Sequence, residues 1–212
     1  MKPRVLLADD HRLVAEGLKS LLSADFELVG LVEDGRALLE AARRLRPDVI
    51  VADITMPLLN GIDALVQLKQ DNKQVRVVFL TMHLEAAYAR RAFEAGASGY
   101  VLKHSAPTEL IAAVLAALDG KTYLTPALAG EVLQAMRDGP AKATDPVAAL
   151  TPRQREILQL LAEGRSAKEI STTLSVSART VEFHKYQMME SLHIDNNAEL
   201  IHFAIKQGIV AI

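Results

Sequence analysis

The chain has 212 residues, half of them hydrophobic and 24% charged, a composition that argues against a disordered or collagen-like protein and allows one large or two small domains. Its formal charge of −2 offers no overall basic excess, so nucleic acid or an anionic membrane could be bound only by a local surface. The lack of cysteine excludes disulfides, thiolate metal sites and cysteine nucleophiles, which is typical of a reducing, intracellular protein.

The amino-terminal segment contains only four consecutive apolar residues, 5–8, before Asp9 and Asp10 interrupt them. A signal peptide needs a longer apolar run, and a membrane-spanning helix needs about 20 residues. No other stretch of the sequence reaches that length. The sequence therefore predicts a soluble, cytoplasmic protein with no membrane partner.

Short apolar runs alternate with helical periodicity from the start of the chain to about residue 119. Strands that are apolar throughout and separated by helices indicate a parallel sheet covered on both faces. The sequence therefore predicts an α/β domain with a flavodoxin-like, doubly wound, five-stranded parallel sheet, whose ligands bind at the carboxyl ends of the strands. The expected strands are residues 5–8, 28–32, 49–52, 75–80 and 99–102.

The pattern changes after Gly120. Residues 126–137 predict one helix, and residues 138–146 contain Gly and Pro at positions that break regular structure. We interpret this region as a linker with one helix, flexible enough to let two domains rearrange.

A small all-α domain is expected in residues 150–212, because four short segments begin with residues that can cap a helix by accepting hydrogen bonds from its first backbone N–H groups. The signals are Thr151 with Gln154, Ser166 with Glu169, Ser177, and either Asn196 or Asn197. The segments 166–174 and 178–192, joined by a tight turn at 175–177, predict a helix-turn-helix. Such a motif places its second helix in the major groove of DNA.

The second helix of this motif has two different faces. At 100° per residue, Val181, Met188 and Leu192 share the inward face. The opposite face is unusually aromatic for a solvated helix, which is the alternative interpretation. It carries Arg179, Glu182, Phe183, Tyr186, Gln187 and Glu190. An aromatic side chain there could contact a thymine methyl group, and the polar ones could bind phosphates or base edges.

Acidic residues follow two strands of the predicted sheet. Asp9 and Asp10 follow the first strand and Asp53 follows the third, and these strands are neighbours at the switch point of a doubly wound sheet. Three carboxylates brought together need a cation, and oxygen ligands without Cys or clustered His favour Mg²⁺. Each aspartate alone is more often a helix cap or a turn residue, so the prediction depends on the joint pattern.

The last two strands end in further polar residues. The fourth strand is followed by Thr81, a hydroxyl, and the fifth by Lys103, a fixed positive charge. A carboxylate nucleophile, a divalent cation, a lysine and a hydroxyl together can accept a phosphoryl group. Tyr100 is equally consistent with an aromatic residue of a half-buried strand and with a residue that takes part in a switch. An aspartate-nucleophile phosphatase normally has a second aspartate two residues after the first, where this chain has Thr55.

Seven motifs carry a resemblance to a known family. LADDH at 7–11, ADITMPLLNG at 52–61, LTMH at 80–83 and AGASGYVLK at 95–103 resemble the receiver domain of two-component response regulators. LTPRQREIL at 150–158, EGRSAKEI at 163–170 and RTVEFH at 179–184 resemble the LuxR-type DNA-binding domain. Together they resemble the NarL/FixJ family of transcriptional regulators. The resemblance implies a receiver domain at 1–120, the linker at 121–149 and a DNA-binding domain at 150–212.

The resemblance also implies roles in the first domain. Asp53 would be phosphorylated by a sensor histidine kinase, and the only catalysis would be self-phosphorylation and self-dephosphorylation at that residue. Mg²⁺ would be held by Asp10, Asp53 and the carbonyl of Thr55, with Asp9 acting partly through water.

Three further positions would serve the phosphoryl group. Lys103 would pair with it, Thr81 would move towards it, and the ring of Tyr100 would move inward. Such a displacement changes the surface that meets a partner domain or subunit.

The second domain of such a protein binds promoter DNA as a dimer formed on phosphorylation, at an inverted repeat, with RNA polymerase as a further candidate partner. The resemblance implies DNA contacts by Lys168, Ser177, Arg179, Thr180, Glu182, Phe183, Lys185, Tyr186 and Gln187. Residues 151–212 contain seven basic and seven acidic residues, so the sequence predicts weak non-specific DNA binding. The alternative is a regulator that acts mainly through protein contacts, with weak or lost DNA binding.

Overall fold

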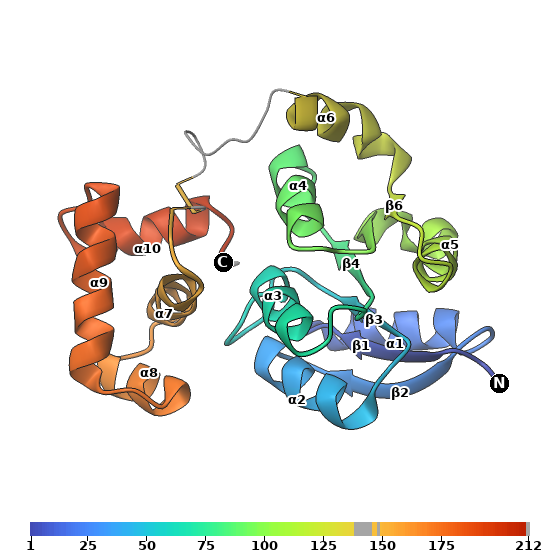
Figure 1. Ribbon diagram of the computed structural model, residues 1–212, viewed down its shortest axis with the longest axis horizontal. Coiled ribbons are helices and arrows are strands. Elements are labelled where there is room, and N and C mark those ends of the chain that lie inside the picture. The colour runs from blue at the N-terminus through green and yellow to red at the C-terminus, as the bar shows by residue number, and fades with distance from the viewer. Residues whose placement is uncertain (138–145, 148, 211–212) are drawn as a thin grey trace. The chain divides into compact units, whose positions relative to one another are not determined.

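The computed structural model describes residues 1–137, 146–147 and 149–210 (Figure 1). They form two compact units, Met1–Gly139 and Pro140–Ile212. The predicted flexible segment at 138–146 lies, except for Pro146, outside the described residues.

The first unit contains a parallel sheet with strand order β2-β1-β3-β4-β5-β6. The predicted α/β fold class is confirmed, with one strand more than expected. The sixth strand has only two residues, and so short a strand shows no hydrophobic periodicity by which the sequence could predict it. The strands are β1 (Arg4–Ala8), β2 (Glu27–Val32), β3 (Val49–Ala52), β4 (Val77–Thr81), β5 (Gly99–Leu102) and β6 (Tyr123–Leu124).

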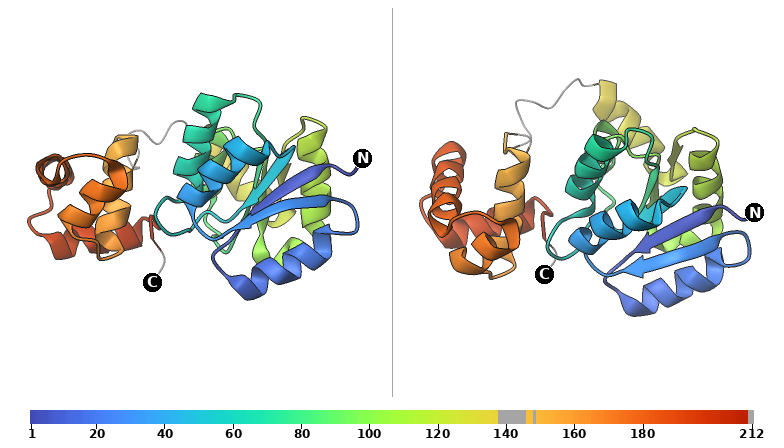
Figure 2. Two further views of the ribbon diagram at one scale, coloured as in Figure 1. Left: turned by 90° about the horizontal axis from the view of Figure 1, so that it is seen from below. Right: turned by 60° about the horizontal axis from the view of Figure 1, so that its bottom comes forward.

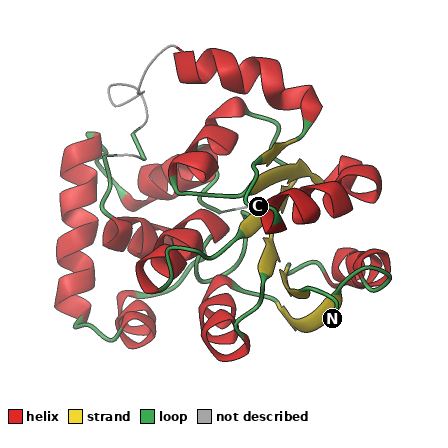
Figure 3. Cartoon of the chain, turned by 45° about the vertical axis from the view of Figure 1, so that its right-hand side comes forward, coloured by secondary structure: helices red, strands yellow, loops and turns green. Residues whose placement is uncertain are grey.

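Helices cover both faces of this sheet (Figures 2 and 3). One face is packed by α1 (Arg12–Leu22) and α5 (Ala106–Leu118). The other is packed by α2 (Gly35–Leu45), α3 (Gly61–Asp71) and α4 (Ala86–Glu94). Successive strand residues supply the two cores, so Val78 packs with α1 and α5 while Phe79 packs with α2 and α3.

The predicted linker helix, α6 (Pro126–Arg137), packs against α4 as part of the first unit (Figure 1). Its Leu128 and Val132 are buried in the same core as α2, α3 and α4. The residue before it, Thr125, donates its backbone N–H to the carbonyl of Tyr100 (2.9 Å), and its hydroxyl accepts from the N–H of Leu102 (3.2 Å). The start of α6 is thus bound to β5.

Two glycines of the first unit are expected to respond in opposite ways to alanine. A Cβ at Gly35 would lie 1.8 Å from the carbonyl oxygen of Leu59, so Gly35→Ala should destabilise the unit by about 1–3 kcal/mol. A Cβ at Gly17, within α1, meets nothing within 4 Å, and Gly17→Ala should stabilise it by up to about 1 kcal/mol. Urea unfolding of both variants checks this, and equal effects would contradict it.

The second unit consists of four helices in the part of it that is described. They are α7 (Pro152–Ala162), α8 (Ala167–Leu174), α9 (Ala178–Leu192) and α10 (Asn197–Lys206). The predicted caps are present: Thr151 and Ser166 form capping boxes with Gln154 and Glu169, and Ser177 caps α9. Of the two candidates for the last helix, Asn196 is the cap.

The pair α8 and α9 forms the predicted helix-turn-helix. Ser175 ends α8 in the left-handed conformation (φ 54°), and the N–H of Val176 returns to the carbonyl of Ser171 (3.0 Å). Val181 and Met188 are buried as expected, and Leu192 is half-buried. None of the helices in the described residues has the length and apolar character needed to cross a bilayer.

Candidate functional site

The three predicted carboxylates come together at the carboxyl edge of the sheet. The N–H of Asp53 donates to the carbonyl of Ala8 (2.9 Å), which joins the end of β3 to the end of β1. One ligand atom from each of Asp9, Asp10, His11 and Asp53 lies within 4.8 Å of the others. An acidic cluster of this kind suits a hard cation with oxygen ligands.

Lys103 bridges two of these carboxylates. It is the first residue of η1 (Lys103–Ser105), directly after β5, and its Nζ lies 2.6 Å from Asp53 Oδ2 and 2.8 Å from Asp9 Oδ2. Burial alone would lower the pKa of Lys103, but the two carboxylates outweigh burial and raise it. The ammonium group is therefore a fixed positive charge at this edge.

Asp53 is 5% exposed, and both of its carboxylate oxygens are engaged. Oδ1 accepts from the N–H of Ile54 (2.6 Å) and more weakly from that of Thr55 (3.4 Å). Burial raises the pKa of Asp53 above its ordinary value, even though Lys103 acts to lower it. Such a buried carboxylate beside a lysine has the surroundings of a functional group.

The donor set fits a divalent cation such as Mg²⁺. Asp10 Oδ1 is buried, and His11 Nδ1 lies 2.9 Å from it. A buried carboxylate oxygen beside two more carboxylates is a position that a cation satisfies. His11 had not been singled out from the sequence, since its ring reaches the cluster only through the turn before α1.

Thr81 and Tyr100 lie beside this cluster and are fully buried. The Tyr100 ring already stands in the inward position that the resemblance implies for the phosphorylated protein, and its hydroxyl donates to the carbonyl of His83 (3.0 Å). The hydroxyl of Thr81 accepts a hydrogen bond from the backbone N–H of His83 (3.2 Å). The two predicted switch residues are thus connected through His83, which the sequence had not indicated as functional.

The side chain of His83 also belongs to this network. Its Nε2 forms a 2.8 Å hydrogen bond with the hydroxyl of Thr55, and its ring stacks on Tyr88 of α4. Burial lowers the pKa of His83, more than Glu85 and Asp53 raise it. A neutral imidazole is therefore favoured in this bond.

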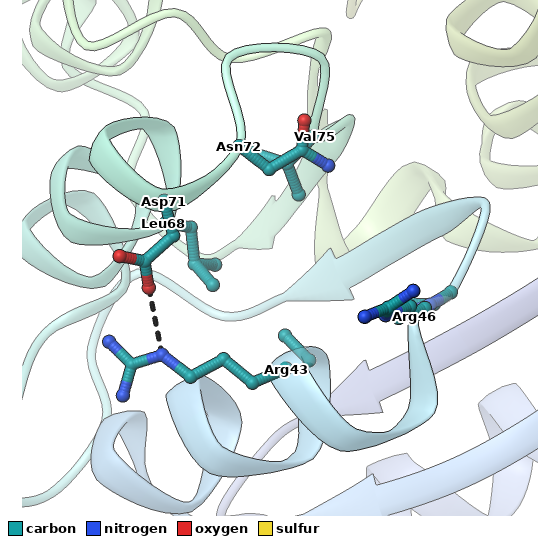
Figure 4. A pocket seen from close by; sticks show the side chains of 8 residues that line it. Arg43, Arg46, Leu68, Asp71, Asn72 and Val75 are labelled. Atoms are coloured by element: carbon teal, nitrogen blue, oxygen red, sulfur yellow. Dashed lines mark hydrogen bonds and ion pairs between the residues drawn. The ribbon is translucent and has the colours of Figure 1, made fainter.

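A groove of about 500 Å³ lies elsewhere, between the carboxyl ends of α2 and α3 (Figure 4). It adjoins the residues before β3 and β4, so it opens at the opposite edge of the sheet from Asp53. Its polar side chains, which include Arg43, Arg46 and Asn72, are all exposed, and Arg43 pairs with Asp71 (2.8 Å). The groove plays no part in the site at Asp53.

The outward face of α9 carries exposed aromatic side chains, with Phe183 57% and Tyr186 62% exposed. Arg179, Gln187 and, on α8, Lys168 are also exposed. The other predicted DNA-contacting residues are Ser177 and Thr180, whose hydroxyls are bonded to each other (2.8 Å), and Glu182 and Lys185.

Lys185 is buried, and its charge is paired. It is 8% exposed, with its Nζ 2.5 Å from Glu182 Oε2 and 4.8 Å from the centre of the Tyr186 ring. The stem packs inward, but the ammonium group faces a carboxylate. This pairing reduces the positive charge that α9 presents to a phosphate backbone.

Two family models match the chain. The response regulator receiver domain matches residues 5–115, and the model of bacterial regulatory proteins of the luxR family matches residues 148–204. The chain belongs to the LuxR-type response regulators. It is a non-enzymatic transcription regulator of a two-component system.

Relatives of this response regulator match over nearly its whole length. The transcriptional regulatory protein MctR of Rhizobium johnstonii is 38% identical over 99% of this chain and 96% of its own. The response regulator UvrY of Escherichia coli is 31% identical over 97% and 94%. Among solved structures, RcsB of Salmonella typhimurium has a TM-score of 0.66 and 27% identity, covering 97% of this chain and 98% of its own. Receiver domains typically bind Mg²⁺ through an acidic cluster such as that of this response regulator.

Proposed function

We propose that a sensor histidine kinase phosphorylates Asp53. The observation that carries this proposal is Lys103, whose ammonium group lies between Asp53 and Asp9 at the end of the central strands. A carboxylate oxygen of Asp53 would form a bond to phosphorus while the bond from phosphorus to the phosphohistidine nitrogen breaks. Lys103 would then neutralise charge on the phosphoryl oxygens.

Mg²⁺ would be held by Asp10, Asp53 and the backbone carbonyl of Thr55, with Asp9 acting partly through water. Bound there, the cation would neutralise charge on the phosphoryl group during transfer. The buried oxygen of Asp10, close to the carboxylates of Asp9 and Asp53, supports this assignment.

Phosphorylation would act through Thr81 and Tyr100, and through them on α4. Thr81 would turn its hydroxyl from the N–H of His83 towards the phosphoryl group. Because β5 also binds Thr125, a change at Tyr100 would reach α6 and the segment that leads to the second unit.

The output would be a dimer on promoter DNA, with α9 in the major groove. The expected division would be a receiver at 1–120, a linker at 121–149 whose helix α6 packs on the first unit, and a DNA-binding domain at 150–212. In solved structures, RcsB forms dimers on DNA, and it has been captured on a promoter with the phosphomimetic BeF₃⁻. Such a dimer acts in the cytoplasm, where it could contact RNA polymerase.

Phosphorylation should make the protein a dimer that binds an inverted repeat with half-sites about one helical turn apart, since two-fold protein symmetry imposes two-fold operator symmetry. Sedimentation of the full chain with and without acetyl phosphate and Mg²⁺, alone and on its operator, measures this. A phosphorylated protein that occupies its operator as a single monomer would contradict the proposal.

A second candidate function, regulation through protein contacts with weak DNA binding, is favoured by the pairing of Lys185 with Glu182. If that pair limits DNA binding, Glu182→Gln should free Lys185 for a phosphate and steepen the salt dependence of random-DNA binding by about one unit in log–log slope. Binding titrations at several salt concentrations measure the slope.

The matched control is Glu190→Gln, the same charge change at an exposed residue of α9. An equal change in both variants would show that only net charge matters. No binding of Glu182→Gln to any DNA would favour the second candidate function.

A further inference from the structure

His83 connects the loop after β3 with α4. Its Nε2 lies 2.8 Å from the hydroxyl of Thr55, two residues after Asp53, although the two residues are 28 positions apart in the chain. The side chain of His83 is 24% exposed and that of Thr55 is half-buried. A hydrogen bond that is partly shielded from water in this way holds the two loops together.

The same imidazole is held on its face by α4. The rings of His83 and Tyr88 stack with centroids 4.1 Å apart and planes 14° apart. Arg91, one turn further along α4, lies 5.7 Å from the centre of the Tyr88 ring. The position of the His83 ring therefore depends on the position of α4.

The backbone of His83 is held as well. Its N–H donates to Thr81, and its carbonyl accepts from Tyr100. Within the described residues, His83 is thus bonded to both switch residues through its backbone, while its ring joins Thr55 to Tyr88. Leu84, the next residue of the same loop, is 56% exposed, and in the described residues its side chain makes no hydrogen bond or ring contact of this kind.

We propose that His83 is a positioning residue that couples the cation site to α4. By holding the hydroxyl of Thr55, His83 keeps the backbone of that residue, and its carbonyl, in place for Mg²⁺, and by stacking on Tyr88 it ties this placement to α4. The proposal rests on the proposed function, in which the carbonyl of Thr55 is a cation ligand. Coupling is reciprocal, so bound Mg²⁺ also steadies α4 in this position.

Two substitutions of His83 separate its two contacts. His83→Phe keeps a ring against Tyr88 and loses the bond to Thr55, whereas His83→Gln can keep that bond and loses the stack. Thr55→Val removes the same hydrogen bond from the other side with little change in shape. Leu84→Ala is the control in the same loop.

Calorimetric titration of the full chain with MgCl₂ should give a three- to tenfold weaker affinity for His83→Phe and for Thr55→Val. The double variant should be no weaker than either single variant, because both remove one bond. His83→Gln should stay within twofold of wild type, as should Leu84→Ala. Affinity of His83→Phe within twofold of wild type, or losses that multiply in the double variant, would overturn the proposal.

Hydrogen exchange of the α4 amides, with and without saturating MgCl₂, tests the second contact. Mg²⁺ should slow exchange of α4 in wild type and in Leu84→Ala, and in neither His83 variant. An unchanged response in His83→Phe, or no response in wild type, would contradict the coupling. Thr55→Val provides the same test if a His83 variant fails to fold.

These outcomes are separable from failure of the proposed function. A wild-type chain that binds no Mg²⁺ at millimolar concentration would refute the cation site, and with it the proposed function. A wild-type chain that binds Mg²⁺ while the His83 variants behave identically to it would refute only the role of His83.

Discussion

Replacing Asp53 by asparagine is expected to abolish labelling of the protein by radioactive acetyl phosphate in the presence of Mg²⁺. Asp53 combines a buried carboxylate, the ammonium group of Lys103 at 2.6 Å and the neighbouring Asp9 and Asp10. The asparagine amide cannot form an acyl phosphate, so the variant should take up no label at this position. In wild type, the label should be stable in acid and removed by base and by hydroxylamine.

The matched control for this change is Asp25→Asn, which removes an exposed carboxylate from the loop between α1 and β2. It should take up label as wild type does. Label with the same chemical stability in Asp53→Asn would mean that the phosphoacceptor is a different residue.

The Asp53→Asn variant should be more stable than wild type at pH 7. Because burial raises the pKa of Asp53 above 3.8, the folded state binds this proton more tightly than the unfolded state, and the ionised carboxylate lowers stability at higher pH. Asp53→Asn should therefore add about 1 kcal/mol at pH 7, a typical gain from relieving a functional group. The gain should shrink as the pH falls towards 3.8. Urea unfolding at pH 4 and 7 measures it, and a loss of stability at pH 7 would contradict it.

The residues of the acidic site could be predicted because they occupy strand ends. A parallel sheet brings Asp9, Asp53, Thr81 and Lys103 to one edge whatever their side chains do, so the order of strand ends was sufficient to place them together. The helix caps of the second unit could be predicted for a similar reason, since a cap and its partner are three residues apart in the chain.

The features that the sequence did not reveal depend on side-chain geometry between distant segments. The bond from Thr55 to His83 joins two loops whose relative placement no local pattern encodes. The strand β6 has two residues, Tyr123 and Leu124, which pair with Gly99 and Tyr100 of β5 without any longer apolar run. On α9, the spacing of Glu182 and Lys185 was visible, but their pairing depended on the rotamers of both side chains.

Replacing Phe183 by alanine is expected to weaken binding to the specific operator by about 1–3 kcal/mol, the usual scale of base readout, with little change on random DNA. Phe183 is 57% exposed on the outward face of α9 and has no polar group for a phosphate. Its contribution should therefore be an apolar contact with particular bases, such as a thymine methyl group. Gel shifts with operator and random duplexes, at one salt concentration, measure the two losses.

Arg179 provides the contrasting control on the same helix, because it is exposed and carries a guanidinium group that can bind a phosphate. Arg179→Ala should weaken binding to both duplexes and lower the salt slope by about one unit. Lys185→Ala should have this effect only to the extent that Lys185 leaves Glu182 for a phosphate on binding.

The exposure of Phe183 also argues against the explanation that Phe183→Ala weakens DNA binding by destabilising the domain. A side chain that is more than half exposed contributes little to folding, so Phe183→Ala should change the unfolding free energy of the domain by less than about 0.5 kcal/mol. Equal losses on operator and random DNA with unchanged stability would mean that α9 enters the groove in another orientation. Equal losses with reduced stability would mean that Phe183 supports the domain and does not read bases.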